Sequence, residues 1–233
     1  MTHGNAWLDS AAPVGVREQL DAGEDWREWL PAEPVSPDPA SPVDEALAPV
    51  ERPTGPVAPQ PHVAMPEEPL PVQRRGSGPA LWVVGAHGGA GESTLAELDE
   101  GWAAAGHCWP ELPAPARAAC VVVARTNVRG LLAARAALTQ WAASGTGESV
   151  ELLGLVLVAD APGKRPAPIR DLAKVVAGGA PRVWTVPWVE AWRLGDPVTE
   201  RPPRAVSKLA STLRSLAASS SGGAVTSHPE EKS

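Results

Sequence analysis

The sequence predicts an α/β fold, with a parallel sheet of about four or five strands and helices on both faces, flanked by disordered termini. Two observations support this prediction. From Ala80 onward, short apolar runs alternate with helix-like segments, which is typical of parallel strands joined by right-handed crossovers. Residues 31–71, in contrast, hold 13 prolines among 41 residues and almost no large apolar side chains, so this stretch cannot bury enough surface to offset its chain entropy.

Four apolar runs are the expected strands. Each is short and rich in Val, Leu or Ala, which is the pattern of strands that are buried on both faces of a sheet. They are residues 80–84 (ALWVV), 119–124 (ACVVVA), 152–159 (LLGLVLVA) and 182–187 (RVWTVP).

A helix-like segment follows each expected strand. The first places Leu95, Leu98 and Trp102 on one helical face. Asn127 offers an N-cap to the second, and Pro168 can open the third. The expected helices are residues 93–106, 127–141, 168–177 and 205–217.

The chain divides into an arm, a domain and a tail. We expect residues 1–78 to be a disordered, acidic, proline-rich arm, residues 79–217 to be the α/β domain, and residues 218–233 to be a disordered tail. Charge follows a similar division. Residues 1–72 carry 13 acids and 3 bases, whereas residues 73–233 carry 14 acids and 17 bases.

One stretch of the arm, residues 16–30 (VREQLDAGEDWREWL), has a partial apolar face that includes Trp26 and Trp29. Two interpretations remain open for it: a docking helix that folds on a protein partner, or a nascent helix without one. The arm as a whole fits either a solubilising linker or an acidic segment that competes with an anionic ligand of the basic domain.

Residues 85–94 (GAHGGAGEST) form a glycine-rich turn between the first expected strand of the domain and its helix. Such folds place ligands at this end of a strand, and glycines let backbone N–H groups converge on an anion. The candidate binding residues are His87, Gly88, Gly89, Ala90, Gly91, Glu92, Ser93 and Thr94.

This loop resembles the deviant Walker A loop of the ParA/MinD group of P-loop ATPases, which reads approximately GKGGxGK[ST]. Gly88, Gly89 and Gly91 match the glycines of that group, and Ser93 falls at the position of the hydroxyl that holds Mg²⁺. Weaker similarity continues to the segment VWTVPWVEAWR, over about 110 residues in all. The resemblance implies a shortened P-loop NTPase-like fold, with ATP and Mg²⁺ as the family's cofactors.

Three substitutions and one shortening separate the chain from that group. Ala86 replaces the first glycine, His87 the signature lysine and Glu92 the phosphate-binding lysine. Where the group has switch I and the Walker B aspartate, this chain has only residues 107–119, with Glu111 as their single acid. Phosphoryl transfer needs positioned metal and water. We therefore expect a non-hydrolysing protein that binds nucleotide weakly, if at all, and acts through a partner; an active nucleotide-dependent switch or ATPase is the alternative.

Glu92 is the departure that bears most directly on phosphate. Opposite unit charges at about 4 Å attract by about 4 kcal/mol at an effective dielectric of about 20, and a carboxylate turns this attraction into repulsion. Glu92 could instead cap the first turn of its own helix. Compensating charge could come from protonated His87, from Arg125, Arg129, Lys164 or Arg165 at neighbouring strand ends, or from Mg²⁺ bridging Glu92 to a phosphate.

Other classes of binding are less well indicated. We expect Trp184, Trp188 and Trp192 to be packing residues rather than a platform for bases. The histidines and cysteines lack zinc-site spacing, and the weak positive charge of the domain argues against nucleic acid. Without an apolar run of about 18 residues or a signal peptide, we expect a cytoplasmic protein with no membrane span, and a homodimer is compatible with the sequence.

Overall fold

The computed structural model of this chain describes residues 53–222. The expected helix at 16–30 and residues 223–233 of the expected tail lie outside the described residues. The chain divides into two units, Met1–Pro42 and Val43–Ser233, and all described residues belong to the second. Within them, none of the helices combines the length and the apolar character that a membrane crossing requires.

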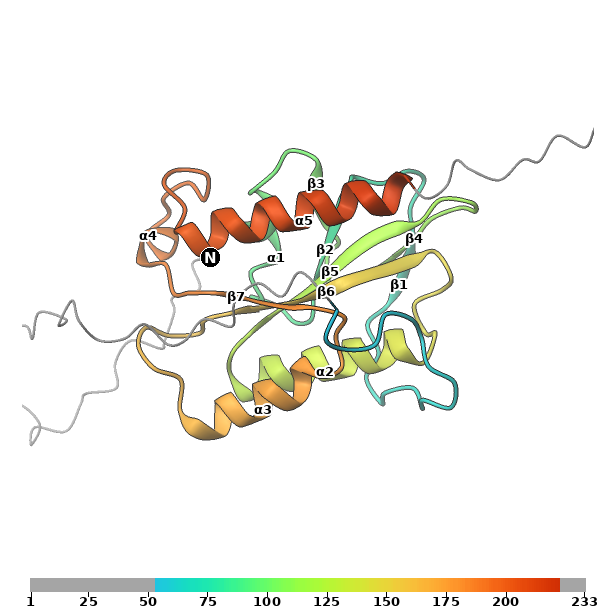
Figure 1. Cartoon of the computed structure of the whole chain (residues 1–233), viewed down its shortest axis with the longest axis horizontal. Coiled ribbons are helices and arrows are strands. Elements are labelled where there is room, and N and C mark those ends of the chain that lie inside the picture. The colour runs from blue at the N-terminus through green and yellow to red at the C-terminus, as the bar shows by residue number, and fades with distance from the viewer. Residues whose placement is uncertain (1–52, 223–233) are drawn as a thin grey trace, which may run out of the picture. The chain divides into compact units, whose positions relative to one another are not determined.

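The domain is built on a five-stranded parallel sheet with the strand order β3-β2-β5-β6-β7 (Figure 1). Four of its strands coincide with the apolar runs of the sequence, and the fifth, β3, lies at one edge beside β2. The predicted α/β class with a parallel sheet is therefore confirmed. The strands are β2 (Leu81–Gly85), β3 (Trp102–Ala104), β5 (Ala118–Arg125), β6 (Val150–Val158) and β7 (Val183–Val186).

Helices cover both faces of this sheet: α2 and α3 lie on one face, α1 and α5 on the other (Figure 1). Because alternate residues of a strand point to opposite faces, the side chains of β5 divide between two cores. Cys120 and Val122 belong to the core under α2, whereas Val121 and Val123 belong to the core under α5. The helices are α1 (Glu92–Ala96), α2 (Val128–Ala142), α3 (Ala167–Ala177), α4 (Glu190–Arg193) and α5 (Arg204–Gly222).

Two helices begin where their capping residues predict. Asn127 is the N-cap of α2, and its side chain accepts a hydrogen bond from Gly130 N at 2.8 Å. Pro168 lies in the first turn of α3, where its missing N–H costs no hydrogen bond, and Gly178 ends that helix.

The helix expected at residues 93–106 is much shorter in the structure. It ends at Ala96, and the chain then turns at Gly101, whose N–H donates to Asp99 Oδ1 at 2.8 Å. Trp102 follows as the first residue of β3 and is buried in the sheet. Burial of this large side chain outweighs the helix propensity of the alanines that follow it.

Part of the expected arm belongs to the folded domain. β1 (Val72–Arg74) pairs with β4 (Trp109–Glu111) in a separate two-stranded parallel sheet. Further upstream, Thr54 N donates to Pro181 O at 2.8 Å. The domain therefore begins before the boundary expected at Pro79, because backbone groups of this proline-rich stretch find partners far away in the sequence.

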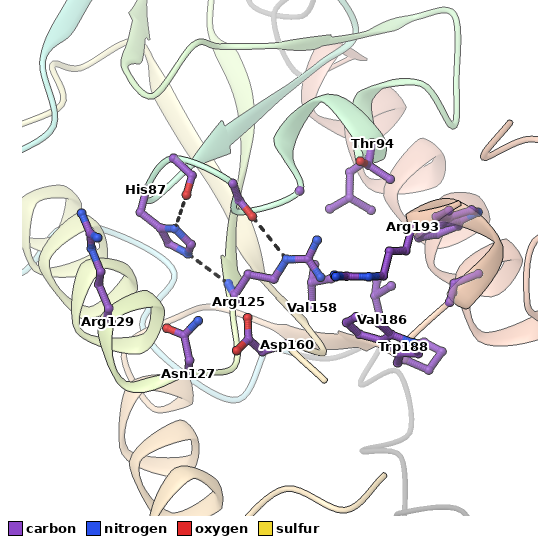
Figure 2. A pocket seen from close by; sticks show the side chains of 17 residues that line it. His87, Thr94, Arg125, Asn127, Arg129, Val158, Asp160, Val186, Trp188 and Arg193 are labelled. Carbon is purple, nitrogen blue, oxygen red and sulfur yellow. Dashed lines mark hydrogen bonds between the residues drawn. The ribbon is translucent and has the colours of Figure 1, made fainter. Parts of the chain in front are cut away.

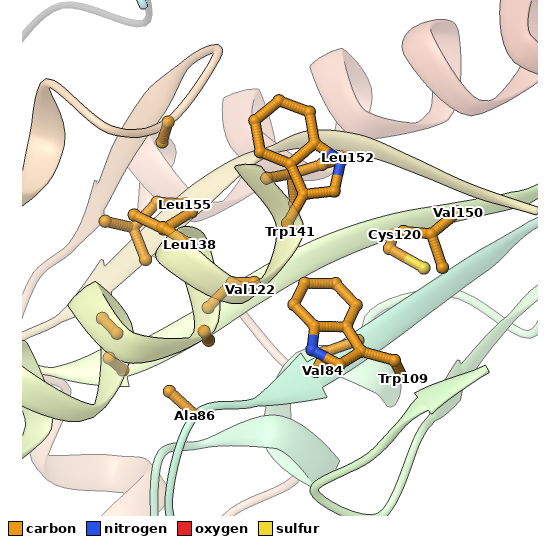
Figure 3. Close-up of a cluster of buried hydrophobic side chains, with 14 of the residues drawn as sticks. Val84, Ala86, Trp109, Cys120, Val122, Leu138, Trp141, Val150, Leu152 and Leu155 are labelled. Atoms are coloured by element: carbon orange, nitrogen blue, oxygen red, sulfur yellow. The ribbon is translucent and has the colours of Figure 1, made fainter. Parts of the chain in front are cut away.

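Gln140 on α2 fixes this incoming stretch to the core. Its buried side chain accepts hydrogen bonds through Oε1 from Leu70 N at 2.8 Å and from Trp109 Nε1 at 3.0 Å. Its Nε2 donates to Leu70 O at 2.8 Å and to Gly145 O at 3.1 Å. All four hydrogen-bonding positions of the amide are filled, and the ring of Trp109 packs in the core beside α2 (Figure 3).

We predict that Gln140→Leu lowers the free energy of unfolding by about 1–3 kcal/mol, because the buried indole N–H of Trp109 and the half-buried backbone groups of Leu70 and Gly145 lose their hydrogen bonds. Urea unfolding followed by circular dichroism measures this loss. Arg135→Ala, at an exposed position of the same helix, should change stability by less than about 0.5 kcal/mol. Equal losses for the two variants would contradict the role given to Gln140.

Candidate functional site

The carboxyl ends of the strands border an open cavity of about 510 Å³ (Figure 2). Its lining comes from the loop after β2 and α1, the end of β5 and the start of α2, the end of β6, and the chain from the end of β7 through α4. Parallel sheets bind ligands at this edge because their loops converge on it. A smaller hollow of about 260 Å³ adjoins the cavity and shares Gly89, Gly91, Thr94 and Arg125 with it.

The glycine-rich loop borders both spaces. Gly89 has a φ of 76° and Gly91 a φ of 98°, in the left-handed region where other residues are strained. Five of the eight residues predicted for binding line the larger cavity, and the other three line the smaller hollow. The first group is His87, Gly88, Gly89, Gly91 and Thr94, and the second is Ala90, Glu92 and Ser93.

The carboxylate of Glu92 is buried and engaged by the turn that follows β3. Its Oε1 accepts hydrogen bonds from Gly106 N at 2.8 Å and from His107 N at 3.3 Å. Its Oε2 lies 3.0 Å from His107 Nδ1. The amides that Glu92 bonds are therefore not those of its own helix, as the sequence suggested, and the side chain acts as a tie between α1 and this turn.

His87 ties the loop to β5. Its Nε2 accepts a hydrogen bond from the backbone N–H of Arg125 at 3.2 Å, and its Nδ1 lies 2.8 Å from Gly88 O. Both ring nitrogens are thus engaged by backbone groups of the loop and of β5, whereas the sequence suggested this ring as a source of charge for a phosphate.

Three arginines supply positive charge to the cavity: Arg125 from the end of β5, Arg129 from α2 and Arg193 from α4. Arg125 is held on both sides, since its Nε donates to Gly89 O at 3.2 Å and its Nη1 to Ala159 O at 2.8 Å. The side chains of Arg125 and Arg193 extend into the cavity from opposite sides (Figure 2).

Sequence reasoning named only part of this basic set. Arg125 and Arg129 follow a strand end that the sequence places at this edge, and both line the cavity. Lys164 and Arg165, named on the same argument, are not among the lining residues. Arg193 was missed, because nothing local in the sequence shows that the chain after β7 turns back over the cavity.

Two tryptophans form an apolar wall of the cavity. Trp188 and Trp192 are half-buried lining residues, whereas Trp184 is fully packed in the core. The indole N–H of Trp188 donates to Glu190 Oε2 at 2.6 Å, and the guanidinium of Arg193 lies 5.6 Å from the ring centroid. The packing role expected for all three is therefore correct for Trp184 and incomplete for the other two.

Carboxylates are scarce around this site. Asp160, at the end of β6, is the single acid among the residues that line the larger cavity, and it is exposed. The two strands beside β2 end at Ala104 and Arg125, so neither directs an acid toward the loop. Across residues 53–222, no three His, Cys, Asp or Glu residues are grouped so that they could hold a metal ion.

We predict that Glu92→Lys lowers the free energy of unfolding by about 1–3 kcal/mol, because an ammonium offers no acceptor to the two N–H groups that the carboxylate bonds. Glu92→Gln keeps an acceptor oxygen and should cost less. Thermal and urea unfolding of the two variants give the comparison.

Glu97→Lys is the matched control for this charge change, since Glu97 is exposed and lies one turn further on. It should leave stability nearly unchanged. If Glu92→Lys were as stable as the unsubstituted chain and gained nucleotide affinity, Glu92 would be a simple replacement of the phosphate-binding lysine and not a structural tie.

Neither the curated proteins nor the solved structures contain a match to this chain. Comparison with family models gives a match over residues 79–210 to a family of unknown function, DUF6668. These residues include the five strands of the parallel sheet and the glycine-rich loop. Because the match spans more than half of the chain, this protein belongs to the DUF6668 family.

Proposed function

We propose that this protein is a ParA/MinD-like protein that binds a nucleotide without hydrolysing it and acts through a protein partner. The main support is that Arg125, Arg129 and Arg193 all line one cavity whose lining includes a single acid. Guanidinium groups that border one cavity repel one another because they carry the same charge. An anion placed among the guanidinium groups replaces this repulsion with attraction, and phosphate oxygens match the guanidinium fork.

The apolar wall of the cavity favours a nucleotide over a simple inorganic anion. The guanidinium of Arg193 covers one face of the Trp188 ring, so a base can stack on the other face, and stacking of a base on an aromatic side chain contributes about 1–3 kcal/mol. The smaller hollow at the glycine-rich loop adjoins the cavity through shared residues, among them Arg125. A nucleotide with its base in the cavity and its phosphates near Arg125 uses both spaces.

The surroundings of the loop argue against hydrolysis. Catalysis of phosphoryl transfer requires groups that position metal and water. The carboxylate of Glu92 is already bonded to the turn after β3, and the strands beside β2 end in Ala104 and Arg125. The alternative, an active nucleotide-dependent switch, is favoured by the hydroxyls of Ser93 and Thr94 at the smaller hollow.

We predict that the full chain binds ADP and that Arg193→Gln weakens this binding about tenfold or more, because a hydrogen bond to a charged group contributes about 1.5–3 kcal/mol. Arg193 is exposed, so its substitution should leave the fold intact. Isothermal titration calorimetry gives the dissociation constants, and Arg135→Gln, outside the cavity on α2, is the matched control.

Two further measurements distinguish nucleotide binding from binding of a simple anion, and a binding protein from an active ATPase. Trp188→Ala should weaken ADP binding but leave binding of inorganic pyrophosphate unchanged, since pyrophosphate has no base to stack. Phosphate release from ATP at an ordinary turnover, lost on Ser93→Ala, would replace the proposal with an active ATPase. Unchanged ADP affinity in Arg193→Gln would remove the arginine cluster from the binding site.

The proposed partner contact is residues 16–30 of the acidic arm, which lie outside the described residues. Its support is the pair Trp26 and Trp29 in an acidic segment. We predict that Trp26→Ala combined with Trp29→Ala weakens co-purification of the protein partner and leaves thermal unfolding of the domain unchanged. Undiminished co-purification would exclude this segment as the contact.

A further inference from the structure

We infer that the cavity takes its phosphate ligand free of Mg²⁺, and that Mg²⁺ in solution competes with the site for the ligand. This inference rests on the proposed nucleotide binding and concerns the charge state of the ligand. It departs from the cofactor that the resemblance to ParA/MinD ATPases implies, because the residues around the loop do not suit Mg²⁺.

The position of Arg125 is the first observation. Its guanidinium reaches from the loop carbonyl of Gly89, at 3.2 Å, to the carbonyl of Ala159 at the end of β6, at 2.8 Å. It therefore occupies the space between the loop and Asp160, which immediately follows Ala159 (Figure 2). A fixed cation stands where a metal ion shared by Asp160 and a loop-bound phosphate would lie.

The second observation concerns Glu92 and Asp160, the carboxylates that line the smaller hollow and the cavity. In phosphate sites Mg²⁺ is bound by one or two carboxylates together with the phosphate oxygens. Both carboxylate oxygens of Glu92 already contact Gly106 and His107, at distances of 2.8–3.3 Å. A metal bridge from Glu92 to a phosphate would have to break this tie, so Asp160 is left as a single carboxylate on the far side of Arg125.

The arginines can neutralise the phosphates without a metal. Nε and Nη1 of Arg125 donate to carbonyls, whereas Nη2 donates no hydrogen bond within residues 53–222. Arg193 and Arg129 add exposed guanidinium groups. Mg²⁺ bound to a phosphate chain lowers its negative charge and occupies the oxygens that a guanidinium fork would otherwise bind. The metal-free form is thus the better ligand for this cavity.

The test is titration of the full chain with ADP, once in EDTA and once in Mg²⁺ in excess over ADP, with ionic strength matched by KCl. We expect the affinity in EDTA to exceed that in Mg²⁺ by about tenfold, because the two forms of ADP differ in charge. Equal affinity, or tighter binding in Mg²⁺, overturns the inference while leaving nucleotide binding in place. No binding in either solution removes the proposed function and this inference together.

Asp160→Asn tests whether this carboxylate holds Mg²⁺. If the ligand binds without metal, removing the single carboxylate of the cavity strengthens ADP binding in EDTA and leaves the preference for EDTA in place. If Asp160 holds Mg²⁺, the same substitution weakens binding in Mg²⁺, which contradicts the inference. Arg135→Ala, on the exposed face of α2, should change neither titration.

Discussion

The hydrogen bonds of Arg125 are the constraint on which the site depends. Its side chain donates hydrogen bonds to Gly89 O in the loop after β2 and to Ala159 O after β6. Its backbone N–H donates to the ring of His87. The charge is thereby fixed in the middle of the carboxyl edge of the sheet. Two hydrogen bonds to carbonyls of different segments restrict the movement of this cation.

Glu92 and Arg125 together explain how the loop departs from the family that it resembles. A lysine at position 92 would bring the cation from the helix, whereas here the cation comes from the end of β5. The carboxylate turns toward Gly106 and His107 and becomes part of the scaffold. The backbone N–H groups of Gly106 and His107 offset part of the negative charge at position 92, and Arg125 supplies a cation to the same hollow.

The parts of the fold that the sequence predicts are those determined by local pattern. The four continuous apolar runs became buried strands, and the cap at Asn127 marked the start of α2. β3 was not predictable, because three residues beginning with Trp102 carry no strand pattern and their pairing depends on β2. The glycine loop was visible for the same local reason, whereas Arg193 and Trp188 reach the cavity only through the path of the chain after β7.

The two ends of α2 connect the N-terminal stretch to the site. Near its start, Gly130 packs so closely that a Cβ would lie 2.3 Å from Arg125 O and 2.9 Å from His87 Nε2, so only glycine allows this approach. Near its end, Gln140 holds Leu70. A helix moves largely as a rigid element, so a shift of α2 changes both contacts at once. α2 is therefore the element that links the incoming stretch at Leu70 to the loop and to Arg125 at the cavity.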